Sequence, residues 1–382
     1  MKKTGLAKKI FAIFVAVSMT VLSISGCGSS GGSSSDKIKI GTSFPMSGSV
    51  AADGQLIVNA VKLAAEQVND KGGINGKKIE VVSEDDEGSP TSASSVANKF
   101  AENNDIMGVI TSYNSSCCLA QVPVFEEAGL PAISPVSTST QLTGISDYFY
   151  RTCNNDAYVG MLCADYSKKL GFSKVAILYE QDDYGEGIYK EYKKQAEKIG
   201  MKVNAVETFV YGETKDFSTI ITNLKKADID GIFFAGLVTE MSLFSSQAKT
   251  MGLSGIPIFA DEGCNSPAML AEGGENVEGM YTTGGFAAES DEQVVKDFVA
   301  AYNKEFGSDP SVWAALGYDA AMTMFEAMKA CGDDISRESI NKQLQGISYE
   351  GVTGLNKFKN SDVEKEYYIF QVKDGKFTIV EQ

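Results

Sequence analysis

The stretch over residues 106–143 constrains the fold more than any other part of this 382-residue chain. Residues 106–111 form a short apolar run typical of a strand, and residues 119–128 have the length and apolar spacing of a helix. Gly129 can take the left-handed conformation that ends a helix, and residues 130–134 are a second strand-like run. Strand, helix and strand at this spacing form a βαβ unit with parallel strands. Its loops meet at the sheet edge where open α/β sheets bind ligands.

Hydroxyl groups are concentrated in the two loops at that edge. The residues that carry them are Ser115, Ser116, Ser137, Thr138 and Ser139. Hydroxyls and the free N–H groups at helix starts suit a carboxylate or another small anion. We therefore expect these side chains to converge on one small site.

Composition narrows the classes of function. The length indicates about two domains, and the net charge of −16 argues against nucleic acid, which needs a basic footprint. The chain has no histidine, which removes histidine bases, histidine metal ligands and Ser-His-Asp chemistry. The acids at 84–87 are interpreted as a solvated loop rather than a metal site, and the cysteines after Cys27 as buried free thiols rather than disulfides. We expect no metal and no cofactor.

The N-terminus has the pattern of a targeting sequence. Four lysines within residues 2–9 precede an apolar run over 10–21, and the small pair Ser25-Gly26 stands directly before Cys27. This pattern predicts a lipoprotein signal peptide and acylation of Cys27, followed by a Gly/Ser tether. The alternative is an ordinary signal peptide with a chance cysteine.

Strand and helix patterns alternate twice along the remaining chain. After the first strand, the pattern predicts a loop over residues 44–55 and a helix over 56–70. A second α/β unit of the same type is predicted over 158–266, and a tail with long helices and strands, one of them at Phe358, completes both lobes. The expected organisation is a signal peptide at 1–26, the acylated cysteine and tether at 27–36, lobe 1 at 37–156 plus 286–360, and lobe 2 at 157–285 plus 361–382.

A series of motifs in order carries a resemblance to a known family. The motifs are PMSG at 45–48, VNDKGGINGKKIE at 68–80, Asp85-Asp86, YNSS at 113–116, EAGLPAISPVSTSTQLT at 127–143, YRTC at 150–153, DDYGEG at 182–187, KDFSTIITNLKKADIDGIFFAG at 215–236 and DEG at 261–263. The chain resembles the solute-binding lipoproteins of ABC importers for branched-chain amino acids. The resemblance implies the α/β type I periplasmic-binding-protein fold, in which two open α/β lobes are joined by a multi-strand hinge with a cleft between them.

The resemblance also implies roles for five residues at an amino acid's charged ends. Ser115 would bind the α-carboxylate, the Val136 carbonyl would accept from the ammonium, and Thr138 would touch both. Tyr184 would close over the ammonium, and Glu262 would pair with it. Each has a local alternative: a helix cap for Ser115, a loop hydrogen bond for Thr138, a core position for Tyr184 and a solvated loop acid for Glu262.

Five further residues fall at side-chain pocket positions and differ from the leucine-binding members. They are Asp53, Tyr113, Asn114, Leu237 and Val312. Because a carboxylate beside a purely aliphatic ligand is unfavourable unless hydrated or paired, Asp53 suggests a ligand more polar than leucine or a relaxed specificity. The rival hypothesis is that Asp53 points to solvent and Leu237 enlarges an apolar pocket.

The expected function is non-enzymatic capture of an amino acid, branched-chain or related, for delivery to the transmembrane subunits of an ABC permease. The expected protein is an exported monomer, lipid-anchored at the extracytoplasmic face of the cell membrane, with no nucleic-acid partner. The alternative is a ligand-binding sensor for an amino acid or amide on the same fold.

Overall fold

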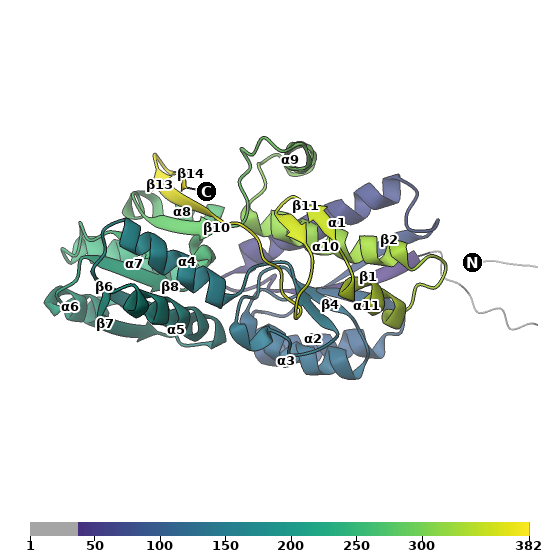
Figure 1. Ribbon diagram of the computed structural model, residues 1–382, viewed down its shortest axis with the longest axis horizontal. Coiled ribbons are helices and arrows are strands. Elements are labelled where there is room, and N and C mark those ends of the chain that lie inside the picture. Colours follow the sequence, from purple (N-terminus) through teal and green to yellow (C-terminus); the bar gives the residue numbers. More distant parts are fainter. Residues whose placement is uncertain (1–36, 382) are drawn as a thin grey trace, which may run out of the picture. The chain divides into compact units, whose positions relative to one another are not determined.

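A computed structural model describes residues 37–381 of the chain (Figure 1). The predicted signal peptide, Cys27 and the Gly/Ser tether lie outside the described residues. Among the residues described, no helix is long and apolar enough to cross a membrane.

The first lobe is built on a parallel five-stranded sheet in the order β2-β1-β3-β4-β5. Its strands are β1 (Lys37–Phe44), β2 (Lys78–Asp85), β3 (Ile106–Thr111), β4 (Ala132–Ser134) and β5 (Phe149–Arg151). Its helices are α1 (Ala51–Asp70), α2 (Pro90–Glu102), α3 (Ser115–Glu127), α9 (Gln293–Phe306), α10 (Val312–Ala330) and α11 (Arg337–Gln345), and a short hairpin joins β11 (Tyr349–Gly351) to β12 (Gly354–Asn356). Apolar faces of α1 and α10 pack together in its core, with Ile57 and Leu316 almost fully buried. Strand β3, helix α3 and strand β4 follow one another along the chain, and β3 pairs with β4 in parallel, so the predicted βαβ unit is confirmed (Figure 1).

The second lobe is built on a seven-stranded sheet in the order β14-β13-β10-β9-β8-β6-β7. Its strands are β6 (Lys174–Glu180), β7 (Lys202–Phe209), β8 (Gly231–Ala235), β9 (Ile258–Ala260), β10 (Tyr281–Gly284), β13 (Tyr368–Lys373) and β14 (Lys376–Glu381). Its helices are α4 (Asp156–Lys169), α5 (Asp183–Lys198), α6 (Ser218–Lys226), α7 (Val238–Thr250) and α8 (Pro267–Gly273). Strands β6 to β10 are parallel and β13 and β14 antiparallel, so the C-terminal hairpin returns to this sheet (Figure 1).

Three segments connect the lobes, at residues 152–155, 285–292 and 357–367. Two of them are joined by reciprocal hydrogen bonds: the Asn154 amide donates to the Lys365 carbonyl (2.7 Å), and the Lys365 N–H donates to the Asn154 side chain (2.9 Å). A buried ion pair at 2.5 Å joins Arg151, the last residue of β5 before the first segment, to Asp362 in the third segment. These bonds hold the crossing segments together, as a hinge requires.

Four local predictions were wrong. The acids at 84–87 do not form a solvated loop: Glu84 and Asp85 end β2, and Asp86 is fully buried and accepts from the hydroxyls of Ser43 and Ser112. Helix α1 begins at Ala51, so the loop predicted over 44–55 ends five residues earlier than expected. Asp53 therefore lies in the first turn of a helix. Helix α3 begins at Ser115 rather than at residue 119, because its first turn is polar and carries no apolar periodicity. Phe358 lies outside the strands and packs its ring against Tyr150, with centroids 4.8 Å apart.

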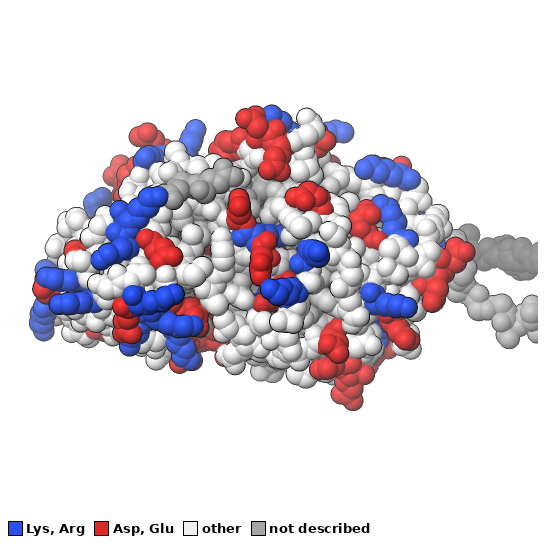
Figure 2. Space-filling view, viewed as in Figure 1, with Lys and Arg blue, Asp and Glu red and all other residues white. Residues whose placement is uncertain are grey.

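The remaining chemistry-bearing side chains are dispersed. The six cysteines of the described part are free thiols, five of them buried, as interpreted from the sequence. Within residues 37–381, no group of three or more histidine, cysteine, aspartate or glutamate side chains could hold a metal ion. On the face in Figure 2, lysine and arginine side chains are interspersed with acidic ones rather than gathered into a basic patch.

Candidate functional site

A small cavity of about 20 Å³ lies between the lobes and is lined from both sides. The first lobe supplies Tyr113, Asn114, Ser115, Val136 and Trp313, and the second supplies Tyr184, Leu237, Glu262 and Gly263. The structure thus brings most of the predicted site residues together, although Asp53, Thr138 and Val312 do not line the cavity. Since a single water needs about 10–15 Å³, an amino acid can enter only when the lobes separate.

The first lobe presents the N-terminus of α3 to the cavity. Asn114 is the N-cap residue and makes no side-chain capping bond, so the first N–H groups of α3 remain available. Ser115 is the first helical residue rather than the cap, and its hydroxyl accepts from the Ser139 N–H at 3.2 Å. The uncapped N–H groups and the positive end of the helix dipole favour an anion here.

The second lobe presents a buried carboxylate with one oxygen that has no partner in the described part of the chain. Glu262 is 3% exposed, and its Oε2 has no hydrogen-bond partner among the described residues. Burial raises the pKa of Glu262 to about 8, the hydroxyl of Tyr367 opposes that rise, and the Asp156 carboxylate adds to it. The hydroxyl of Tyr184, also in the cavity wall, is buried and has no hydrogen-bond partner within residues 37–381. A cation in the cavity would stabilise the charged form of Glu262.

The Asp53 carboxylate is engaged away from the cavity. Its Oδ1 accepts from the Ser266 hydroxyl at 2.6 Å, and its Oδ2 accepts from the Tyr113 hydroxyl at 3.3 Å. Asp53 is 2% exposed, and burial raises its pKa to about 6. It therefore neither faces solvent nor lines the cavity, which differs from both hypotheses made from the sequence.

Two other predicted residues lie at the margin of the site. The Thr138 hydroxyl is buried and has no partner among the residues that the structure describes, while the Thr138 carbonyl accepts from the Asp156 N–H at 2.9 Å. Val312 is the buried first residue of α10 and directly precedes Trp313.

Trp313 and Gly263 line the cavity but were not predicted as site residues, and Trp313 was missed because its spacing on α10 indicates a core position. Its ring is 3% exposed and packs edge-on against Tyr113, with centroids 5.6 Å apart, while also forming part of the cavity wall. A signal was available: it is the chain's only tryptophan and stands one residue after a predicted pocket position.

Arg151 supports the loop that carries Val136 and Thr138. Its guanidinium is fully buried and donates to the carbonyls of Ser137 and Ser139, at 3.2 and 2.8 Å. The same side chain is paired with Asp362 in the third crossing segment. The loop at the cavity is thereby fixed to the hinge.

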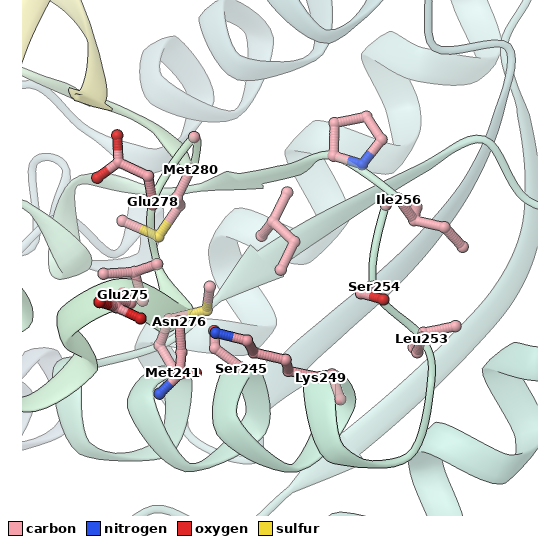
Figure 3. A pocket seen from close by; sticks show the side chains of 16 residues that line it. Met241, Ser245, Lys249, Leu253, Ser254, Ile256, Glu275, Asn276, Glu278 and Met280 are labelled. Carbon is pink, nitrogen blue, oxygen red and sulfur yellow. The ribbon is translucent and has the colours of Figure 1, made fainter. Parts of the chain in front are cut away.

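A larger cavity of about 380 Å³ lies beside α7 in the second lobe (Figure 3). Met241, Ser245 and Lys249 reach it from α7, and residues 253–258 and 275–280 close the other sides. None of the residues predicted to bind a ligand lines it. The smaller cavity between the lobes is therefore the candidate site.

The fold and the small cavity together define a two-lobed binding protein. The first lobe offers donors for an anion and the second offers a carboxylate for a cation. Comparison with known proteins agrees: residues 37–376 match the family model described as "Periplasmic binding protein". The chain belongs to this family, whose members bind solutes and are not enzymes.

Similar proteins cover nearly the whole chain. It is 30% identical over 360 residues to "Leu/Ile/Val-binding protein homolog 1" of Brucella abortus, covering 92% of this chain and 95% of the relative. It is 31% identical over 322 residues to the leucine-, isoleucine-, valine-, threonine-, and alanine-binding protein of Pseudomonas aeruginosa, covering 84% and 85%. Among solved structures, LivJ of Streptococcus pneumoniae, a branched-chain amino acid transporter substrate-binding protein in complex with isoleucine, matches with a TM-score of 0.84 and 30% identity, covering 91% and 100%. These matches confirm the predicted family and the type I fold.

Proposed function

We propose that this protein captures a free amino acid between its lobes and delivers it to the membrane permease of an ABC importer. One observation carries the proposal: a single cavity joins the uncapped N-terminus of α3 to the buried carboxylate of Glu262. A zwitterion supplies an anion to the first and a cation to the second. Because the two groups belong to different lobes, such a ligand favours the closed arrangement, where it contacts both.

In this proposal the ligand carboxylate lies against Ser115 and the first N–H groups of α3, and the ammonium against Glu262 and Tyr184. Val136 lines the cavity, and its carbonyl would provide a further acceptor for the ammonium. Thr138 would take part through the buried hydroxyl that has no partner among the described residues. The names of the relatives, which mention leucine, isoleucine and valine, support an amino acid as the ligand.

The side-chain end of the cavity favours an aliphatic ligand. Its wall there consists of Tyr113, Leu237 and Trp313, and the carboxylate of Asp53 is bonded elsewhere. The buried Oδ1 of Asn114 and the buried Nε1 of Trp313, neither of which has a partner in the described part, are polar atoms that could select a hydroxyl-bearing side chain such as threonine. We infer a small aliphatic amino acid, with threonine as the polar candidate.

The location and organisation of the protein follow from the sequence pattern. We propose that it is a monomeric lipoprotein acylated at Cys27 after removal of residues 1–26, tethered at the outer face of the cell membrane by residues 27–36. The proposed lobe boundaries are those expected from the sequence, 37–156 plus 286–360 and 157–285 plus 361–382. The assignment of β1–β5 to one sheet and β6–β10, β13 and β14 to the other supports them.

Calorimetric titration with each of the twenty amino acids tests the function. We expect saturable one-to-one binding of leucine, isoleucine or valine, with decarboxylated and N-acetylated analogues inactive because each lacks one charged end. No binding by any amino acid, or equal binding of the analogues, would overturn the proposal.

A further inference from the structure

The contact between Asp53 and Ser266 joins the two lobes directly. Asp53 lies in the first turn of α1 in the first lobe, and Ser266 immediately precedes α8 in the second, 213 residues away. Both residues are buried, with Ser266 fully so, and their oxygens are 2.6 Å apart. Two further cross-lobe hydrogen bonds, from Ser49 to Tyr211 and from Gln141 to Asp183, are exposed. A buried hydrogen bond to a carboxylate contributes more than an exposed one.

The second lobe's half of this contact belongs to the loop that carries Glu262. Glu262 and Ser266 lie four positions apart on one short segment. The Asn265 amide fixes that segment to β10 by donating to the Thr283 carbonyl at 3.1 Å. Holding Ser266 therefore also holds the carboxylate that is proposed to pair with the ammonium.

The first lobe's half of the contact belongs to the wall of the cavity. The second oxygen of Asp53 accepts from the Tyr113 hydroxyl, and the Tyr113 ring packs edge-on against Trp313. One carboxylate thus connects the side-chain wall in one lobe with the ammonium-binding loop in the other. When the lobes separate, the bond to Ser266 must break while the bond to Tyr113 can remain.

We propose that Asp53 and Ser266 form a cross-lobe latch that holds the cleft closed around its ligand. Asp53 is a positioning residue in this scheme: it acts through Tyr113 and the Glu262 loop and does not touch the ligand. The latch rests on the proposed function, because it retains the ligand captured in the same cavity. Its expected effect is on the rate of ligand release, since the bond exists only after closure.

A double-mutant cycle of Asp53→Ala and Ser266→Ala tests the latch. Trp313 reports ligand release by stopped-flow fluorescence, with the tightest-binding of leucine, isoleucine and valine as the probe. We expect each single variant to release the ligand about 10- to 150-fold faster, as loss of a charge-assisted hydrogen bond implies. The double variant should be little faster than either single one, because both remove the same bond. Asp53→Asn keeps an acceptor for Ser266 and should weaken binding less than Asp53→Ala.

Ser266 also caps α8, through a 3.2 Å bond from the Ala268 N–H, so a purely structural effect must be separated. If Ser266→Ala acted only through the lost cap, it would speed release by the same factor whether or not Asp53 is present. The increase in the double variant would then be the product of the increases in the two single variants. Ser245→Ala is the matched control, because Ser245 is a buried serine of the same lobe whose hydroxyl has no partner in the described part of the chain. The proposal would be overturned if the rate increases of the two single variants multiply in the double variant, or if the release rate of Ser266→Ala is within twofold of that of Ser245→Ala.

If no amino acid binds, the proposed function fails but the latch remains testable. Small-angle scattering of the ligand-free protein measures how far the lobes are open. The latch predicts a larger radius of gyration for Ser266→Ala than for Ser245→Ala, and equal values would contradict it.

Discussion

Replacing Glu262 by glutamine should lower ligand affinity without destabilising the ligand-free protein. Burial raises the pKa of Glu262 from 4.5 to about 8, and each pKa unit corresponds to about 1.4 kcal/mol. Charging this side chain in the closed cleft without a cation therefore takes roughly 5 kcal/mol, taken as an upper limit. The ligand ammonium offsets this penalty, whereas a glutamine never incurs it and offers only a neutral acceptor.

The expected loss of affinity follows from breaking a buried charge pair. Such truncations weaken binding by about 2–5 kcal/mol. Because glutamine keeps the shape and one acceptor oxygen, we expect about 3 kcal/mol, which is roughly a 150-fold rise in Kd. The melting temperature of the ligand-free variant should be equal to or above that of the wild type at pH 8, since a buried carboxylate has been removed.

Calorimetry of wild type, Glu262→Gln and Glu240→Gln measures the effect. Glu240 is a matched control, because it is a fully buried carboxylate of the same lobe that does not line the cavity and accepts from the Gly212 N–H at 3.0 Å. Its replacement should leave Kd within about threefold, allowing for the usual context dependence of single substitutions. If Glu262→Gln bound as tightly as Glu240→Gln, the assignment of the ammonium site would be refuted.

Three further predictions concern pH, fluorescence and the hinge. Burial raises the pKa of Asp156 to about 7 and that of Glu262 to about 8. The folded state therefore holds more protons than the unfolded state between about pH 4 and 8, and the melting temperature of the ligand-free protein should fall as pH rises through that window. A melting temperature that does not change with pH would contradict this prediction. Ligand binding should change the emission of Trp313, and Trp313→Phe should abolish that change while raising Kd severalfold; an unchanged wild-type spectrum on saturation would place the ligand elsewhere. Arg151→Gln leaves Asp362 buried without its charge partner and should lower the free energy of unfolding, measured by urea titration, by about 3 kcal/mol. A decrease of less than about 1 kcal/mol would contradict this prediction.

Only part of the proposed anion end was predicted from sequence patterns alone: of the five hydroxyl residues expected to converge, Ser115 lines the cavity, whereas Ser116, Ser137, Thr138 and Ser139 do not. The apolar runs before Ser115 and Val136 are parallel neighbours in one sheet, so their following loops had to meet at its carboxyl edge. The grouping of hydroxyls there needed no knowledge of the second lobe. The cation end differed. Tyr184 and Glu262 could be proposed only through the family resemblance, because the local sequence pattern does not indicate which surfaces of the two lobes face each other.

Contacts between lobes escape sequence reasoning for a physical reason. Ser266 was predicted only as the end of a loop, and its bond to Asp53 depends on how the two lobes close. The start of α1 was missed because its first turn, Ala51 to Gly54, lacks an apolar stripe, so Asp53 was placed in a loop. Trp313 satisfies the spacing of a core residue and also forms the cavity wall, and spacing cannot distinguish these two environments.

The most direct test is a crystal structure of the protein with the amino acid that binds most tightly. The ligand carboxylate should lie within hydrogen-bond distance of the Ser115 hydroxyl and the first N–H groups of α3, with its ammonium on the carboxylate of Glu262. A ligand in the cavity beside α7, or one whose ammonium points to α3, would contradict the account.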